Sequence, residues 1–270
     1  MNAHANTGTV LDRILEARRA EVDHRKRVLP ETALKYGVKA APPVRNFAAA
    51  LSRDAINILA ELKPASPSRG IIRDPFDAPA LGKALSEAGA AALSVLTEGE
   101  FFRGSLKNLR DARKEIVLPV LRKDFIFDPW QVWESRANDA DSFLLIVAAL
   151  ADEQLRELIA LGRELGMEPL VEVHTCEELE RALPAGARII GVNNRDLKTL
   201  TVRMETSFEL IEHIPEECIA VAESGLRSHD DLQKLRAAGI DAFLIGEHLM
   251  LSPDPAAALR ALLVPPASGG

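Results

Sequence analysis

Charged and amide side chains stand at the ends of several short apolar runs in this sequence. These residues are Glu61, Lys63, Lys123, Glu172, Asn193 and Glu223. Because a buried charge without a partner is costly, each of them must pair with another group or face water. Clustered carboxylates and ammonium groups also shift one another's pKa values, as general acid–base catalysis requires. A structural ion pair would explain any one residue alone, but the whole set predicts an acid–base site.

The apolar runs are short and mostly continuous, which is typical of parallel strands covered on both faces. The eight predicted strands are Ile56–Lys63, Ala91–Leu96, Leu118–Arg122, Ser142–Val147, Pro169–Val173, Arg188–Val192, Ile219–Ala222 and Ala242–Ile245. Helical segments alternate with them: one covers residues 152–165, and Thr175 and Ser228 each begin another with an acidic residue three positions on. This order predicts a closed (β/α)8 TIM barrel. The alternative is a doubly wound open sheet, which usually carries a glycine-rich first turn, and the sequence has no such pattern.

Glycine-containing segments follow the last two predicted strands. They are Glu223-Ser224-Gly225 and Gly246-Glu247-His248. Glycine lets backbone N–H groups approach an anion without a Cβ in the way, and loops at these positions often bind phosphate in TIM barrels. Residues 64–70 could add hydroxyl groups and a cation. We therefore expect a small phosphorylated substrate.

Residues 1–55 do not fit the strand–helix repeat and predict a helical extension that packs on the barrel. Within them, residues 10–28 form a charged amphipathic pattern and residues 45–51 a shorter one. We expect the catalytic barrel over residues 56–263 and a disordered tail over residues 264–270. Nothing indicates a second folded domain.

Composition and charge exclude several classes of protein. A formal charge of −7 argues against nucleic-acid binding, which recruits clustered Lys and Arg. The longest apolar run covers residues 143–151, far short of the roughly 20 residues that span a bilayer, and no signal peptide is visible. The two cysteines lack metal-ligand spacing, and such a low cysteine count favours a reducing compartment. A single disulfide between them is the alternative. We expect a cytoplasmic monomer without membrane or nucleic-acid partners.

Six segments, in order along the chain, resemble the indole-3-glycerol-phosphate synthase family. They are residues 61–70 (ELKPASPSRG), 120–125 (VLRKDF), 170–174 (LVEVH), 191–197 (GVNNRDL), 222–225 (AESG) and 244–246 (LIG). Residues 94–98 (SVLTE), with Phe102 and Gly104, match as well, so the resemblance covers roughly residues 10 to 262. It implies a TIM barrel with an N-terminal helical extension, and a monofunctional chain that lacks the isomerase domain fused to some members.

The family's activity is implied with the resemblance. Its members convert 1-(2-carboxyphenylamino)-1-deoxyribulose 5-phosphate to indole-3-glycerol phosphate in tryptophan biosynthesis, by ring closure with decarboxylation and dehydration. They use no metal and no organic cofactor. Lys123 would be the general acid that polarises the ribulose carbonyl. Lys63 would hold the substrate carboxylate and could donate a proton during dehydration, and Glu172 and Glu61 are the two candidate bases.

Substrate-binding residues are implied in the same way. Asn193 and Glu223 would orient the hydroxyl groups and the amine of the substrate. The apolar slot for the anthranilate ring would consist of Pro67, Phe102, Phe125, Leu144 and Leu197, for which ordinary core packing is the alternative. The phosphate would be held by Ser66, Ser224, Gly225, Gly246 and the backbone of Glu247. Because an acidic side chain disfavours phosphate, the Glu247 carboxylate is expected to point away.

Two other functions stay open. The first is a Schiff-base aldolase with Lys123 as nucleophile, although a lysine among carboxylates stays protonated, which favours an acid. The second is a phosphosugar-binding barrel without catalysis, which would need the phosphate loops but not the acid–base set.

Overall fold

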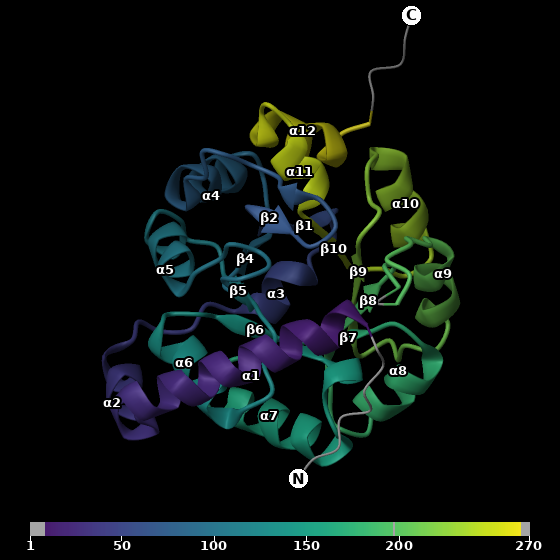
Figure 1. Cartoon of the computed structure of the whole chain (residues 1–270). Coiled ribbons are helices and arrows are strands. Elements are labelled where there is room, and N and C mark those ends of the chain that lie inside the picture. The colour runs from purple at the N-terminus through teal and green to yellow at the C-terminus, as the bar shows by residue number, and fades with distance from the viewer. Residues whose placement is uncertain (1–8, 197, 266–270) are drawn as a thin grey trace, which may run out of the picture.

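The computed structural model describes residues 9–196 and 198–265, with a closed barrel of parallel strands at the centre and helices around it (Figure 1). The strands are β1 (Asn57–Leu62), β4 (Ala92–Leu96), β5 (Val120–Lys123), β6 (Ser142–Ile146), β7 (Leu170–Val173), β8 (Ile189–Asn193), β9 (Ile219–Glu223) and β10 (Ala242–Ile245). Chain neighbours pair in the barrel, and β10 closes it against β1, with Ala242 opposite Asn57. The predicted (β/α)8 fold is confirmed, and the predicted strand ends differ from the observed ones by at most two residues.

Helices follow the strands and cover the outside of the barrel (Figure 1). They are α4 (Ala78–Glu87), α5 (Leu106–Lys114), α6 (Pro129–Ala137), α7 (Asp152–Glu164), α8 (Cys176–Ala182), α9 (Glu205–Ile211), α10 (His229–Ala237), α11 (Glu247–Leu251) and α12 (Pro255–Leu263), with a short 3-10 turn, η1 (Val147–Ala149), after β6. The predicted starts at Thr175 and Ser228 are confirmed, because each hydroxyl oxygen accepts a hydrogen bond from the first turn of its helix. Within the described part of the chain, none of the helices combines the length and apolarity needed to cross a bilayer.

The segment after β1 forms a hairpin that the sequence did not predict. Its strands are β2 (Ala65–Ser66) and β3 (Gly70–Ile71), paired antiparallel. Gly70 has a φ of 67°, a left-handed conformation that glycine adopts without a steric penalty. Two-residue strands are too short to leave a periodic pattern, so only a loop was expected here.

Three helices precede the barrel: α1 (Val10–Val28), α2 (Glu31–Ala40) and α3 (Phe47–Leu51). In Figure 1, α1 lies across one end of the barrel. The sequence predicted α1 and a segment overlapping α3, but α2 was missed. Its one buried residue, Leu34, packs with Val22 of α1 and Trp130 of α6, so tertiary contacts rather than a strong apolar stripe stabilise this helix.

A buried ion pair fastens α1 to the end of β5. Arg18 donates two hydrogen bonds to Asp124, with N–O distances of 3.0 and 2.8 Å. Both side chains are almost completely buried. Because Asp124 directly follows Lys123, the helical extension is attached beside one of the predicted site residues.

Candidate active site

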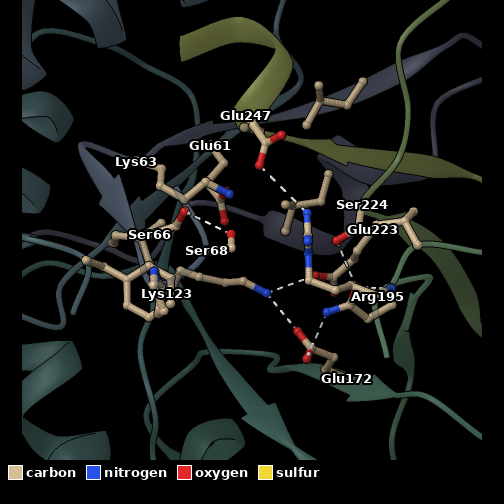
Figure 2. A pocket seen from close by; sticks show the side chains of 18 of the residues that line it. Glu61, Lys63, Ser66, Ser68, Lys123, Glu172, Arg195, Glu223, Ser224 and Glu247 are labelled. Atoms are coloured by element: carbon tan, nitrogen blue, oxygen red, sulfur yellow. Dashed lines mark hydrogen bonds and ion pairs between the residues drawn. The ribbon is translucent and has the colours of Figure 1, made fainter. Parts of the chain in front are cut away.

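A cavity of about 460 Å³ opens at the C-terminal ends of the strands (Figure 2). This volume lies in the range of small-molecule sites. All six predicted acid–base residues line it: Glu61, Lys63, Lys123, Glu172, Asn193 and Glu223. They come from or directly follow β1, β5, β7, β8 and β9, whose carboxyl ends meet at one end of the barrel. The structure therefore brings together residues that are up to 162 positions apart, from Glu61 to Glu223 (223 − 61).

Lys123 lies between two carboxylates. Its Nζ is 2.8 Å from Oε2 of Glu172 and 2.8 Å from Oε2 of Glu223, as the dashed lines in Figure 2 show. Burial disfavours the ammonium form, but the charges of the two glutamates outweigh burial and raise the pKa of Lys123 above its ordinary value. The Lys123 side chain is therefore an ammonium group rather than a free amine.

The two glutamates beside Lys123 differ in their surroundings. Burial would raise the pKa of Glu172, but the positive charge of Lys123 outweighs this and lowers that pKa to about 2. Asn193 also donates a hydrogen bond to Glu172, at 3.2 Å. For Glu223, burial and the charge of Glu172 both act upward and bring the pKa to about 7. Its Oε1 is buried and has no hydrogen-bond partner among the described residues.

Two glycines leave room for the carboxylates. A Cβ atom on Gly246 would lie 2.1 Å from Oε2 of Glu61, and one on Gly191 would lie 2.2 Å from Oε1 of Glu223. Any side chain at either position would displace a site carboxylate. The Glu61 carboxylate is then held by Lys63, whose Nζ lies 2.7 Å from Oε2. Gly246, which was predicted to bind phosphate, thus also makes room for the Glu61 carboxylate.

The residues predicted to hold phosphate lie along the same cavity. They are Ser66, Ser224, Gly225, Gly246 and Glu247. Ser224 and Gly225 both have positive φ, 65° and 84°, and the Ser224 conformation is unusual for a residue with a side chain. The Ser224 hydroxyl donates a 2.8 Å hydrogen bond to Oδ1 of Asn193, which ties this loop to the acid–base residues.

Glu247 departs from its prediction. Its carboxylate does not point away from the site but lines the cavity, toward Arg195 in Figure 2. Oε1 accepts a 2.8 Å hydrogen bond from Nε of Arg69, and Oε2 lies 3.7 Å from Arg195. These two cations explain why an acidic side chain is tolerated here.

Apolar side chains also line the cavity. Pro67, Phe102, Phe125 and Leu144 line it as predicted, and the centroids of the Phe102 and Phe125 rings are 6.0 Å apart. Leu197, the fifth predicted member, lies outside the described residues.

Comparison with known proteins identifies the family. The family model described as indole-3-glycerol phosphate synthase matches residues 11–262. The chain belongs to this family. A relative of that name from Roseiflexus sp. (strain RS-1) is 46% identical over 263 residues, covering 94% of this chain and 98% of the relative. Another, from Rhodococcus jostii (strain RHA1), is 49% identical over 255 residues, covering 94% and 95%.

Solved structures of other barrels are similar in fold alone. A 3-hexulose-6-phosphate synthase aligns with a TM-score of 0.61 at 13% identity, over 77% of this chain and 98% of that one. KGPDC from Streptococcus mutans aligns with a TM-score of 0.60 at 14% identity, over 77% and 96%. Both support the barrel architecture and carry no argument about chemistry.

Some cavity residues of this family member were missed from its sequence. Leu11 and Ile14 reach the cavity from α1, and Arg195 reaches it from the segment after β8. Arg69, which also lines the cavity, lies in the segment 64–70 that was expected to add a cation. Arg195 stands two positions after Asn193, within a segment already singled out, so its position was a usable signal. The α1 residues had only an amphipathic pattern, which does not show what the apolar face covers. Within residues 9–196 and 198–265, no group of three or more His, Cys, Asp or Glu side chains is arranged so that it could hold a metal ion.

Proposed function

We propose that this chain is an indole-3-glycerol-phosphate synthase. It converts 1-(2-carboxyphenylamino)-1-deoxyribulose 5-phosphate to indole-3-glycerol phosphate, carbon dioxide and water, as a carboxy-lyase of tryptophan biosynthesis. Family membership supports the reaction. The observation that carries the mechanism is Lys123, an ammonium group 2.8 Å from each of two carboxylates in a cavity of suitable size.

Ring closure begins with Lys123. Its Nζ donates a proton to the ribulose carbonyl oxygen while the ring carbon that bears the carboxylate attacks the carbonyl carbon. Loss of carbon dioxide then restores the aromatic ring. Because the ammonium group already polarises the carbonyl and supplies the proton, we propose that this step needs neither a metal ion nor an organic cofactor.

Dehydration requires a base and a second proton donation. We assign the base to Glu172, with Glu61 as the alternative. The charge of Lys123 lowers the pKa of Glu172, so this pKa rises once Lys123 has given its proton away. Glu172 therefore becomes a stronger base at the point when the carbon next to the nitrogen must be deprotonated. Lys63, paired with Glu61 at 2.7 Å, supplies the proton for the departing hydroxyl.

The rest of the cavity positions the substrate. Phe102, Phe125, Pro67 and Leu144 contact the anthranilate ring. Leu197, which lies outside the described residues, stays a prediction from the sequence as the fifth member of this set. Asn193 and Glu223 orient the hydroxyl groups and the amine. The phosphate binds between the hairpin and the loops after β9 and β10, at Ser66, Ser224, Gly225, Gly246 and the backbone N–H of Glu247.

We also propose that residues 1–55 and the barrel over residues 56–263 form one catalytic unit that works as a cytoplasmic monomer. The cavity wall supports a single unit, because it includes Leu11 and Ile14 of the extension together with strand-end residues of the same chain.

The test is an indole-fluorescence assay of the purified protein with the phosphorylated ribulose substrate, in buffer containing a metal chelator. We expect product formation at an unchanged rate with and without chelator. Borohydride treatment during turnover should leave Lys123 unmodified, since no Schiff base forms. A reduced covalent adduct on Lys123 would instead identify an aldolase, and binding without product would identify a non-catalytic phosphosugar-binding barrel.

A further inference from the structure

The loop between β4 and α5 carries one of the aromatic side chains of the cavity. Within its residues 98–104, Phe102 lines the cavity, and its ring centroid is 6.0 Å from that of Phe125. Glu98 and Gly104 belong to the same family-like segment of the sequence, but the proposed reaction gives neither of them a role. What holds this loop therefore decides where one wall of the ring pocket lies.

Glu98 is a buried carboxylate that bonds the backbone of its own loop. The residue is 2% exposed. Its Oε1 accepts a hydrogen bond from the N–H of Glu100 at 2.8 Å, and its Oε2 accepts two more, from the N–H of Phe101 at 2.8 Å and of Phe102 at 3.0 Å. A buried charge is costly unless hydrogen bonds stabilise it, and bonds to an ionised acceptor are stronger than neutral ones. The position of the Phe102 backbone is therefore coupled to this carboxylate.

The base of the loop is fixed against the end of β4. The N–H of Gly104 donates a 2.7 Å hydrogen bond to the carbonyl oxygen of Glu98, and the N–H of Ser105 donates one to Leu96 at 3.3 Å. A Cβ atom on Gly104 would lie 2.3 Å from the carbonyl oxygen of Leu96, so only glycine allows this close return. The loop is thus held at its base by the backbone and in its middle by the Glu98 carboxylate.

The opposite aromatic wall is held in the same way. The backbone N–H of Phe125 donates a 2.8 Å hydrogen bond to Oδ1 of Asp124, which is also buried. The two loops are joined next to these bonds, because Thr97 donates its hydroxyl to Asp124 and its N–H to the carbonyl oxygen of Lys123, the latter at 3.1 Å. Phe102 and Phe125 therefore each have a backbone N–H bonded to a buried carboxylate, and the two walls share a common base.

We propose that Glu98 is a positioning residue for the aromatic end of the substrate, an inference that rests on the proposed function. Glu98 does not line the cavity that the described residues form, but it sets the Phe102 ring opposite Phe125 before substrate binds. A preformed pocket avoids the cost of ordering the loop on binding. Unlike Asp124, which also bonds two arginines, Glu98 bonds only its own loop, so its replacement tests the loop alone.

The test compares Glu98→Gln with the parent in the indole-fluorescence assay. Glutamine keeps the size of the side chain but replaces one acceptor oxygen with an NH2 group that faces a backbone N–H. Because the substrate ring keeps its contacts from the bound state to the transition state, KM should rise about tenfold while kcat changes less than about twofold. Glu100→Gln is the matched control, since Glu100 lies in the same loop with an exposed side chain, and it should follow the parent.

Two inhibitors and a double-mutant cycle separate positioning from a general effect on the fold. Anthranilate, as a competitive inhibitor, reports on the aromatic end of the site, and inorganic phosphate reports on the other end. Glu98→Gln should weaken inhibition by anthranilate about tenfold and leave inhibition by phosphate within about twofold. Phe102→Ala should raise KM as well, and adding Glu98→Gln to it should raise KM no more than about twofold further, because the two residues act as one unit.

The positioning role is disproved if Glu98→Gln leaves KM and inhibition by anthranilate unchanged. It is also disproved if inhibition by anthranilate and by phosphate weakens equally, or if the Glu98 and Phe102 substitutions act independently. If Glu98→Gln does not fold, Glu98→Asp decides, with an expected rise in KM of about threefold, because its carboxylate is one methylene shorter and bonds the three N–H groups less well. A parent that forms no indole product would defeat the proposed function itself, whereas a productive parent with an unaffected variant defeats only the positioning role.

Discussion

Two charge clusters lie on opposite sides of β5, and they differ in how completely their charges are paired. The arginine cluster comprises Arg18, Arg122, Asp124 and Glu134. The lysine cluster comprises Lys123, Glu172 and Glu223. Because side chains alternate along a strand, Arg122 points outward to α6, where it bonds Glu134, while Lys123 points into the cavity. The same few residues of chain therefore supply both clusters.

Charges in the arginine cluster are matched. Asp124 accepts hydrogen bonds from Arg18, from Arg122 at 2.9 Å and from the Thr97 hydroxyl. Burial would raise the pKa of Asp124, but the two guanidinium groups outweigh it and lower that pKa to about 2. Oε1 of Glu134, which makes no hydrogen bond among the described residues, forms an ion pair with Arg25 at 2.5 Å. Every charge of the cluster therefore has an oppositely charged partner, and the cluster joins α1, β5 and α6.

Charges in the lysine cluster are not matched. One ammonium group serves two carboxylates, and Oε1 of Glu223 has no hydrogen-bond partner among the described residues. Burial and the charge of Glu172 outweigh the charge of Lys123 and raise the pKa of Glu223 to about 7. A cluster with surplus negative charge and pKa values far apart can accept and give protons near neutral pH. Charged side chains whose ion pairs are complete suit a structural role, whereas a cluster with an excess of carboxylates suits acid–base chemistry.

The largest effect should come from removing the cation of the lysine cluster. Lys123→Met should lower kcat by about 10³-fold or more, because it removes the general acid, while the barrel stays folded. Indole fluorescence measures the loss, and circular dichroism checks the fold. Lys114→Met, on an exposed residue of α5, should behave as the parent. Residual turnover above about 1% of the parent would assign the acid elsewhere.

Removing a cation from the arginine cluster should act on stability instead. Arg122→Met removes one of the two guanidinium partners of Asp124 and leaves Glu134 paired with Arg25 alone. Because both carboxylates are buried, the change should lower the free energy of unfolding by about 3–5 kcal/mol. Urea unfolding measures this change. Arg27→Met, at an exposed position on α1, is the control and should change stability little. An Arg122→Met protein as stable as the parent would mean that the cluster contributes nothing to folding.

The pH dependence of stability should have opposite signs in the two clusters. The Asp124 pKa is lowered to about 2, so its contribution is present above its ordinary pKa and lost as pH falls through 2. The Glu223 pKa is raised to about 7, so its contribution is present below its ordinary pKa and lost as pH rises through 7.

Glu223→Gln tests this sign, because glutamine keeps the shape of the neutral acid. Between pH 5 and 7 the parent should lose stability relative to the variant, by at most about 1.4 kcal/mol per pH unit. Urea unfolding at several pH values gives the difference curve. A flat curve would show that Glu223 titrates as an ordinary carboxyl group.

The smallest effect concerns the exposed pair at the rim, Arg69 and Glu247. Glu247→Gln removes a carboxylate that competes with the substrate phosphate for Arg69 and Arg195, so KM should fall about 3-fold at low salt. Steady-state kinetics at low and high ionic strength would measure it, and the effect should shrink with salt. A higher KM would instead mean that Glu247 holds the arginines in their binding positions.

Much of this protein was predictable from its sequence because strands buried on both faces leave unbroken apolar runs. All eight strands were predicted, and so were the polar residues that end them, such as Glu172 and Asn193. The family was predicted too and is confirmed. Local chemistry also predicted helix starts at Thr175 and Ser228, where a hydroxyl and a backbone N–H are only three residues apart.

Tertiary structure alone decided which of these side chains contact one another and how their charges balance. Helix α2, the hairpin at Ala65–Ile71 and the cavity-lining face of α1 depend on contacts between distant segments, which no local pattern records. The same holds for the orientation of Glu247, which its two arginines determine. The sequence by itself determined the barrel and the residues at its mouth. Only the folded chain places Lys123 between Glu172 and Glu223. Charge balance in a buried site depends on the distances between side chains of different strands, and these distances become short only when the barrel forms.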